Sequence, residues 1–132
     1  MKLLHLQSVC RRKRKKYVHS TPEITAENIL SRNFTANRFG DKWLTDVTEM
    51  KCGFEKKAYC SAILDLADKS IVAFVLGHSN NNELVFKTFE IAREKHPDTT
   101  PLFHSDRGFQ YTSKIFHKKL VDAGMTQSMS RV

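Results

Sequence analysis

The sequence predicts an α/β fold with a mixed central sheet, and three observations support this prediction. Three stretches rich in β-forming residues follow one another within residues 42–77, separated only by short turns. Two stretches whose apolar residues recur at helical spacing come next, and a short apolar run follows each of them. The expected order is β-β-β-α-β-α-β, in which parallel strands and flanking helices extend a three-stranded antiparallel meander.

The first strand of the meander is expected over residues 42–50, KWLTDVTEM. Its side chains alternate, with Asp46 on one face of the strand and, on the other, Trp43, Thr45 and Val47. A turn is expected at Gly53, because glycine adopts the backbone angles that tight turns require.

The second and third strands are expected over residues 56–68 and 70–77, joined by a tight turn at Asp68 and Lys69. The third stretch, SIVAFVLG, is apolar on both of its faces. Continuous apolar strands are typical of positions that are buried on both sides, so this strand is predicted to be central in the sheet or covered.

A helix is expected over residues 79–96, because capping residues precede one apolar face and Pro97 follows its end. The apolar face consists of Leu84, Val85, Thr88, Phe89 and Ala92. Short strands are expected over residues 100–105 and 125–130.

A second helix is expected over residues 112–124, between those two short strands. Phe116 and Leu120 face inward at helical spacing, and Gly124 provides the stop. The residues just before this helix, Gln110 to Thr112, are interpreted as its cap, with a contact to phosphate as the alternative.

The chain of 132 residues is long enough for one domain, and its positive charge is concentrated near the N-terminus. Residues 1–20 contain seven Lys or Arg and no acid, whereas residues 43–132 contain twelve bases and eleven acids. A basic arm on a balanced body indicates an anionic partner, and a solvated tail is the alternative. The basic run consists of Arg11, Arg12, Lys13, Arg14, Lys15 and Lys16.

Other composition features argue against several classes of protein. The three cysteines, Cys10, Cys52 and Cys60, form no Cys-x-x-Cys pair, and an odd count suits a reducing compartment, so we expect neither a zinc site nor a disulfide framework. The apolar start is too short for a signal peptide, and no stretch approaches the roughly 20 apolar residues of a membrane span. The expected location is therefore cytoplasmic, with no membrane partner.

Two aspartates are the candidate functional residues. Asp46 lies mid-strand, where a carboxylate costs free energy unless it is paired or binds a metal. Asp106 ends the strand over residues 100–105, and in this order of elements the fourth strand commonly lies beside the first. The two carboxylates would then meet, and Mg²⁺ (or Mn²⁺) between them would relieve their repulsion and serve phosphoryl transfer. A plain turn at Asp106 is the alternative.

Five motifs in order, NILSRNF, KWLTDVTE, YCSAILDLADKSIV, HSDRGFQYTS and SMSR, give the chain a family resemblance. It resembles the retroviral-integrase-like catalytic core of bacterial insertion-sequence transposases, insertion sequence family three. The resemblance implies an RNase H-like fold and an Asp-Asp-Glu triad, in which Asp46 and Asp106, 60 residues apart, match the two aspartates. It also implies that residues 1–42 are a basic arm with the stub of a preceding helix-turn-helix segment, and that residues 43–132 are a partial catalytic core.

The chain departs from the family pattern at the third acid. In the family the closing Glu lies further along, on a helix, whereas only 26 residues follow Asp106 here and none beyond Asp122 is acidic. We therefore expect a fold that is incomplete at the C-terminus and a polypeptide that is catalytically crippled by itself. The alternatives are a non-catalytic DNA-binding remnant or inhibitor of full-length transposase and, as a third reading, a true ribonuclease H.

The resemblance also implies partners and nearby contacts. The partner is DNA, both element ends and target, with full-length transposase or further copies of the chain as possible protein partners. The basic arm would contact phosphates without reading sequence. His104 and Arg107 flank Asp106 and resemble family positions near DNA, with a self-contained turn as the alternative. Asp65 is interpreted as structural.

Overall fold

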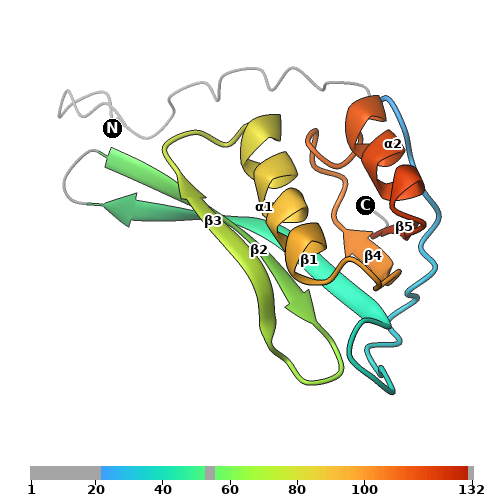
Figure 1. Ribbon diagram of the computed structural model, residues 1–132. Helices are drawn as coiled ribbons and strands as arrows, with labels where there is room; N and C mark the ends of the chain where they lie inside the picture. The colour runs from blue at the N-terminus through green and yellow to red at the C-terminus, as the bar shows by residue number, and fades with distance from the viewer. Residues whose placement is uncertain (1–21, 53–55, 131–132) are drawn as a thin grey trace, which may run out of the picture.

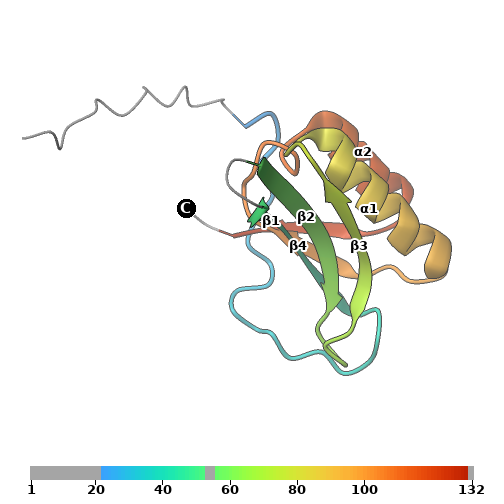
Figure 2. The same ribbon diagram turned by 90° about the vertical axis from the view of Figure 1, so that its left-hand side faces the viewer.

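The structure is a computed structural model that describes residues 22–52 and 56–130. Within these residues, a five-stranded sheet in the order β3-β2-β1-β4-β5 carries two helices on one of its faces (Figures 1 and 2). The elements are β1 (Lys42–Cys52), β2 (Lys56–Asp65), β3 (Ile71–Gly77), α1 (Asn82–Lys95), β4 (Leu102–Ser105), α2 (Lys114–Asp122) and β5 (Thr126–Met129). Neither helix is long and apolar enough to cross a membrane.

The central strand is β1, and its two neighbours run in different directions. It pairs antiparallel with β2, which in turn pairs antiparallel with β3, so the predicted meander is confirmed. On its other side β1 pairs in parallel with β4, and β4 pairs in parallel with β5. The prediction that the first and fourth strands are neighbours is therefore correct, and Leu44 lies level with His104 across that pair.

The prediction that the third strand is central or covered is wrong. β3 is an edge strand, and only the face that packs against α1 is buried, at Val72 and Ala73. The opposite face exposes Ile71, Phe74 and Leu76, with 54, 60 and 60% of their surface accessible. An apolar run shows that a strand tolerates burial, but it does not show which neighbours the chain supplies on each side.

Both helices begin at side-chain caps. Asn81 caps α1 by accepting a hydrogen bond from the Leu84 amide, and all five residues of the predicted apolar face are buried. Ser113 caps α2 by accepting a hydrogen bond from the Phe116 amide. The cap therefore lies one residue beyond the residues predicted to form it, Gln110 to Thr112. Gly124 follows α2 with a φ of +69°, the left-handed conformation that favours glycine at a helix stop.

The core between the helices and the sheet is a cluster of aromatic rings centred on Phe116. Its ring is fully buried and lies within 5.6–5.8 Å, between centroids, of four other rings. These rings belong to Phe86, Phe89, Phe103 and Tyr111. Aromatic contacts of this kind bury large areas and add about 0.5–1.5 kcal/mol per pair, so the cluster fixes α1 and α2 against β4.

Residues 22–31, here called the N-terminal strap, run beside α2 and β5 (Figure 1). The Met129 amide donates to the Glu27 carbonyl, and the amides of Ile29 and Leu30 donate to the Ser128 hydroxyl. At the other end of the strap, Glu23 accepts a hydrogen bond from the first amide of α2. The strap thus covers the β5 edge, which would otherwise expose unpaired backbone groups.

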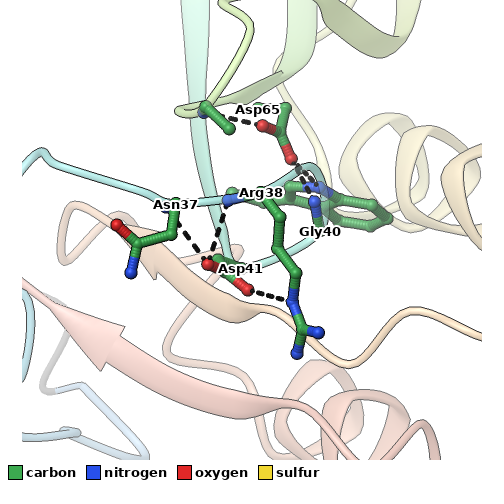
Figure 3. Close-up of polar contacts among 7 residues, drawn as sticks. Asn37, Arg38, Gly40, Asp41 and Asp65 are labelled. Atoms are coloured by element: carbon green, nitrogen blue, oxygen red, sulfur yellow. Dashed lines mark hydrogen bonds and ion pairs between the residues drawn. The ribbon is translucent and has the colours of Figure 1, made fainter.

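The buried carboxylate of Asp65 connects the end of β2 to the start of β1 through hydrogen bonds. Asp65 is fully buried, and its two oxygens accept three N–H groups, from the Gly40 amide at 2.7 Å, the Trp43 indole at 2.9 Å and the Ala67 amide at 2.8 Å (Figure 3). Hydrogen bonds of this number offset the cost of burying the charge. The structure therefore agrees with the structural role expected for Asp65.

Candidate active site

Asp46 and Asp106 both line one open pocket of about 440 Å³. It lies on the helix-free face of the sheet, where the parallel strands β1 and β4 run side by side. Asp46 projects from the middle of β1, and Asp106 is the first residue after β4. Two carboxylates that are distant in sequence therefore open into the same space, which the sequence predicted.

Each carboxylate is held by one backbone amide and is otherwise exposed. Oδ1 of Asp46 accepts the Val47 amide at 2.8 Å, and Oδ1 of Asp106 accepts the Gly108 amide at 2.8 Å. Within residues 22–52 and 56–130, Oδ2 of neither carboxylate has a hydrogen-bond partner. The pocket thus contains carboxylate oxygens that are oriented by the backbone and free to bind a ligand.

Gly108 is needed for the position of the Asp106 carboxylate. A Cβ atom at Gly108 would lie 2.9 Å from Oδ1 of Asp106 and 2.9 Å from Oε1 of Gln110. Both distances are shorter than normal van der Waals contact, so any larger residue would displace these oxygens. The requirement here is space rather than an unusual backbone angle.

Tyr111 is buried near the pocket, with only 1% of its surface exposed, and its hydroxyl contacts Thr45, the residue before Asp46. Burial raises the pKa of its phenol, and the negative charges of Asp106 and Asp46 raise that pKa further. The phenol therefore stays protonated and acts as a hydrogen-bond donor.

His104 lines the pocket, whereas Arg107, which was also predicted to lie near DNA, does not. The Nδ1 atom of His104 lies 2.9 Å from the Ser128 hydroxyl oxygen, and partial burial lowers the pKa of the imidazole. Arg107 is exposed on the loop after Asp106. The six basic residues from Arg11 to Lys16, also predicted to contact DNA, lie outside the described residues.

Within the part of the chain that the structure describes, two carboxylates and no third one line this pocket. No group of three or more His, Cys, Asp or Glu side chains in that part is arranged to hold a metal ion. Asp65 does not line the pocket, because its oxygens are directed toward Gly40 and Trp43.

Sequence reasoning did not identify two residues that shape the site. Tyr111 was assigned to the cap of α2, although its ring is buried against Phe116. Thr45 was assigned only to a strand face, although its hydroxyl contacts Tyr111 at 3.2 Å. The available signal was weak. A large aromatic residue in a turn usually reaches a core, but Phe109 in the same turn is 49% exposed.

The fold is the RNase H-like fold of retroviral integrase catalytic cores. The structure is similar to the HTLV-2 integrase catalytic core domain in complex with magnesium, with a TM-score of 0.61 and 15% identity, covering 69% of this chain and 61% of that one. It is also similar to a chain of the simian T-cell lymphotropic virus intasome, with a TM-score of 0.62 and 13% identity, covering 69% of this chain and 32% of that one.

The family follows from the sequence comparisons. The model of the integrase core domain matches residues 36–132, and the chain belongs to this family. It is 36% identical to an uncharacterized transposase-like protein of Haemophilus influenzae, over 99% of this chain and 60% of the relative. It is 33% identical to the putative transposase InsK for insertion sequence element IS150 of Escherichia coli, over 99% of this chain and 46% of the relative.

These comparisons confirm the resemblance to insertion-sequence transposases that the five motifs predicted. The chain spans 60% and 46% of the length of the two relatives. Each relative therefore contains a substantial segment that has no counterpart in residues 1–132.

Proposed function

We propose that this chain is the catalytic core of a DNA transposase of insertion sequence family three, which carries out metal-dependent phosphoryl transfer on DNA. The observation that supports this most directly is the pair Asp46 and Asp106, which open into one pocket from neighbouring parallel strands. Membership of the integrase core domain family and similarity to transposases support the same class of reaction.

The two aspartates are proposed as the ligands of Mg²⁺ or Mn²⁺. These cations prefer carboxylate oxygens and bind through one or two carboxylates together with water and phosphate oxygens. Asp46 and Asp106 fit this chemistry, because each presents one oxygen that the described protein leaves unpaired. A bound cation would stabilise negative charge at the phosphodiester and help to ionise the attacking hydroxyl. The role of the protein is to hold both carboxylates in place before DNA binds.

The proposed substrate is DNA, both element ends and target. Residues 11–16 are all Lys or Arg, and this run would bind phosphates regardless of base sequence. His104 at the pocket and Arg107 on the adjacent loop are proposed contacts to the same backbone. Binding of this kind weakens steeply with salt, because each phosphate contact releases a counterion.

Residues 1–132 alone are proposed to turn over slowly. The pocket contains two carboxylates, and no acidic residue follows Asp122 in the sequence. Loss of one metal ligand disturbs the geometry on which phosphoryl transfer depends. We therefore propose that a third ligand, if one is used, comes from a longer polypeptide or from a partner such as full-length transposase or a second copy.

The second candidate function is a non-catalytic DNA-binding protein that occupies element ends or inhibits full-length transposase. The observation that favours it is the combination of a basic arm with a site to which the described residues contribute two carboxylates. Both candidates act on DNA and are proposed to operate in the cytoplasm. We also propose the division into a basic arm, residues 1–42, and a catalytic core, residues 43–132.

Nicking of supercoiled plasmid separates the two candidates. We expect the 132-residue chain to bind the plasmid tightly at low salt and to nick it weakly in Mn²⁺, with all nicking lost in Asp46→Asn. Binding with no nicking at any enzyme concentration would favour the non-catalytic function. Robust Mg²⁺-dependent nicking abolished by Asp46→Asn would overturn the proposed slow turnover, and an absence of any DNA binding would overturn both candidates.

A further inference from the structure

A chain of two hydrogen bonds connects the Asp106 loop to the strand that carries Asp46. The Tyr111 hydroxyl lies 3.2 Å from Oγ1 of Thr45, and Oγ1 of Thr45 lies 2.9 Å from the Ala62 carbonyl oxygen. Tyr111 and Thr45 are buried, with 1% and 7% of their surface exposed. The contacts therefore lie in a region of low dielectric constant, where a hydroxyl group that loses its partner is costly.

The direction of each bond follows from the donor and acceptor inventory. A carbonyl oxygen only accepts, so the Thr45 hydroxyl must donate its single proton to Ala62. Oγ1 of Thr45 can then only accept from Tyr111, and the phenol is protonated as that requires. The order is Tyr111 to Thr45 to Ala62, and it joins the loop, β1 and β2.

The position of these residues relative to the carboxylates gives the contact its significance. Thr45 immediately precedes Asp46, and Tyr111 ends the five-residue segment that follows Asp106. The backbone of Tyr111 is also tied down, because its amide donates to the Gly108 carbonyl and its carbonyl accepts from Gln127. A displacement of the phenol would therefore be transmitted to the loop that orients Asp106.

We propose that Tyr111 is a positioning residue, whose hydroxyl holds the Asp106 loop in register with Asp46 through Thr45. The aromatic ring by itself packs on Phe116, with centroids 5.7 Å apart, and phenylalanine would preserve that packing. The hydroxyl group supplies the hydrogen bond, and its role is separate from core filling. The proposal deepens the proposed function, because its consequence for metal binding depends on Asp46 and Asp106 being the ligands.

The test compares Tyr111→Phe with Thr45→Val and with the double variant. Each single change removes one hydroxyl and nearly preserves shape, so both should break the same bond. Tyr59→Phe is the matched control, because Tyr59 lies on β2 and its hydroxyl donates to the exposed Glu49. The first readout is ¹⁵N relaxation of residues 106–110, together with exchange of the Tyr111 and Thr112 amides, both of which donate to Gly108. The second is Mn²⁺ affinity, measured by calorimetry.

We expect Tyr111→Phe to lower the order parameters of the loop, accelerate exchange of both amides several-fold and weaken Mn²⁺ binding about tenfold, the lower end of what loss of an outer-shell partner costs. The double variant should be no worse than the more affected single variant, and the Tyr59 control should match the wild type. A loop that stays ordered in Tyr111→Phe would overturn the proposal, whether or not the melting temperature falls.

The measurement of Mn²⁺ affinity distinguishes this proposal from the proposed function. If the wild type binds Mn²⁺ through Asp46 and Asp106 while Tyr111→Phe binds it equally well, the positioning role is wrong and the proposed function stands. If the wild type does not bind Mn²⁺, the proposed metal site is wrong, and the relaxation data still decide whether the hydroxyl holds the loop.

Discussion

The two faces of the sheet differ in how far they are covered, and their aspartates differ in how many hydrogen bonds they receive. The face under α1 and α2 is closed. Trp43 and Phe103 have at most 1% of their surface exposed and belong to the hydrophobic core, where Phe103 packs on the helix residues Phe89 and Phe116. Among the described residues, the opposite face has no helix (Figure 2). It exposes Phe74 and Leu76 from β3. The first face stabilises the fold, and the second contains the open pocket.

The aspartates show the difference most clearly. Asp65, beside Trp43, receives three N–H groups and has no free surface. Asp46 and Asp106, on the open face, each receive one N–H group and leave an oxygen exposed. A carboxylate whose hydrogen bonds are all satisfied by the protein stabilises structure, whereas one that is oriented but unsatisfied is suited to bind a ligand.

The largest effect on stability is expected at the centre of the closed face. Phe116→Ala removes the ring that four other rings contact, and such truncations typically cost about 3–5 kcal/mol. The matched variant on the open face is Phe74→Ala, which should change the free energy of unfolding by roughly 0.5 kcal/mol or less because Phe74 is already 60% exposed. Urea unfolding followed by circular dichroism measures both, and equal losses would contradict the distinction between the faces.

A smaller effect on stability is expected from replacing one carboxylate oxygen by an amide group, at the buried Asp65 and at the exposed Asp46. Asn has a single acceptor oxygen, so Asp65→Asn leaves at least one buried N–H unsatisfied or opposed by an amide donor. The expected cost is about 1–3 kcal/mol. Asp46→Asn should leave the melting temperature unchanged or slightly higher, because the exposed charge is not needed by the fold. Destabilisation of the same size in both variants would show that Asp46 is structural.

The smallest effect on stability, but a clear effect on the site, is expected from Gly108→Ala. The added methyl would displace the Asp106 oxygen 2.9 Å away, while the backbone conformation at Gly108 is open to alanine. We expect weaker Mn²⁺ binding with little change in melting temperature. Tyr59→Phe is the control, because Tyr59 does not line the pocket and its hydroxyl donates to the exposed Glu49. Unchanged Mn²⁺ affinity in Gly108→Ala would contradict the assigned position of the Asp106 carboxylate.

Much of the fold could be predicted because local rules and topology agreed. The helical spacing of apolar residues identified the buried face of α1, and the order of elements placed the fourth strand beside the first, which brought Asp46 and Asp106 together. The exposure of β3 could not be predicted, because an apolar strand does not reveal which of its faces the rest of the chain covers.

The contacts of Tyr111 and of the N-terminal strap could also not be predicted from the sequence. The Tyr111 hydroxyl meets Thr45 across 66 residues, and the Ile29 amide meets Ser128 across 99 residues. Such pairings depend on tertiary distances that no local pattern encodes. Polar side chains in a turn are most simply assigned to the turn itself, which is why Tyr111 was interpreted as part of a cap.

The most direct test of the shared site is a Mn²⁺ titration of the wild type, Asp46→Asn, Asp106→Asn and the double variant, followed by calorimetry. Asp68→Asn, in the exposed turn between β2 and β3, is the control. If one cation is held by both aspartates, each single variant should lose most of the binding, the double variant should lose little more, and the control should match the wild type. Independent, additive losses from the two single variants, or binding that persists in the double variant, would contradict a common site.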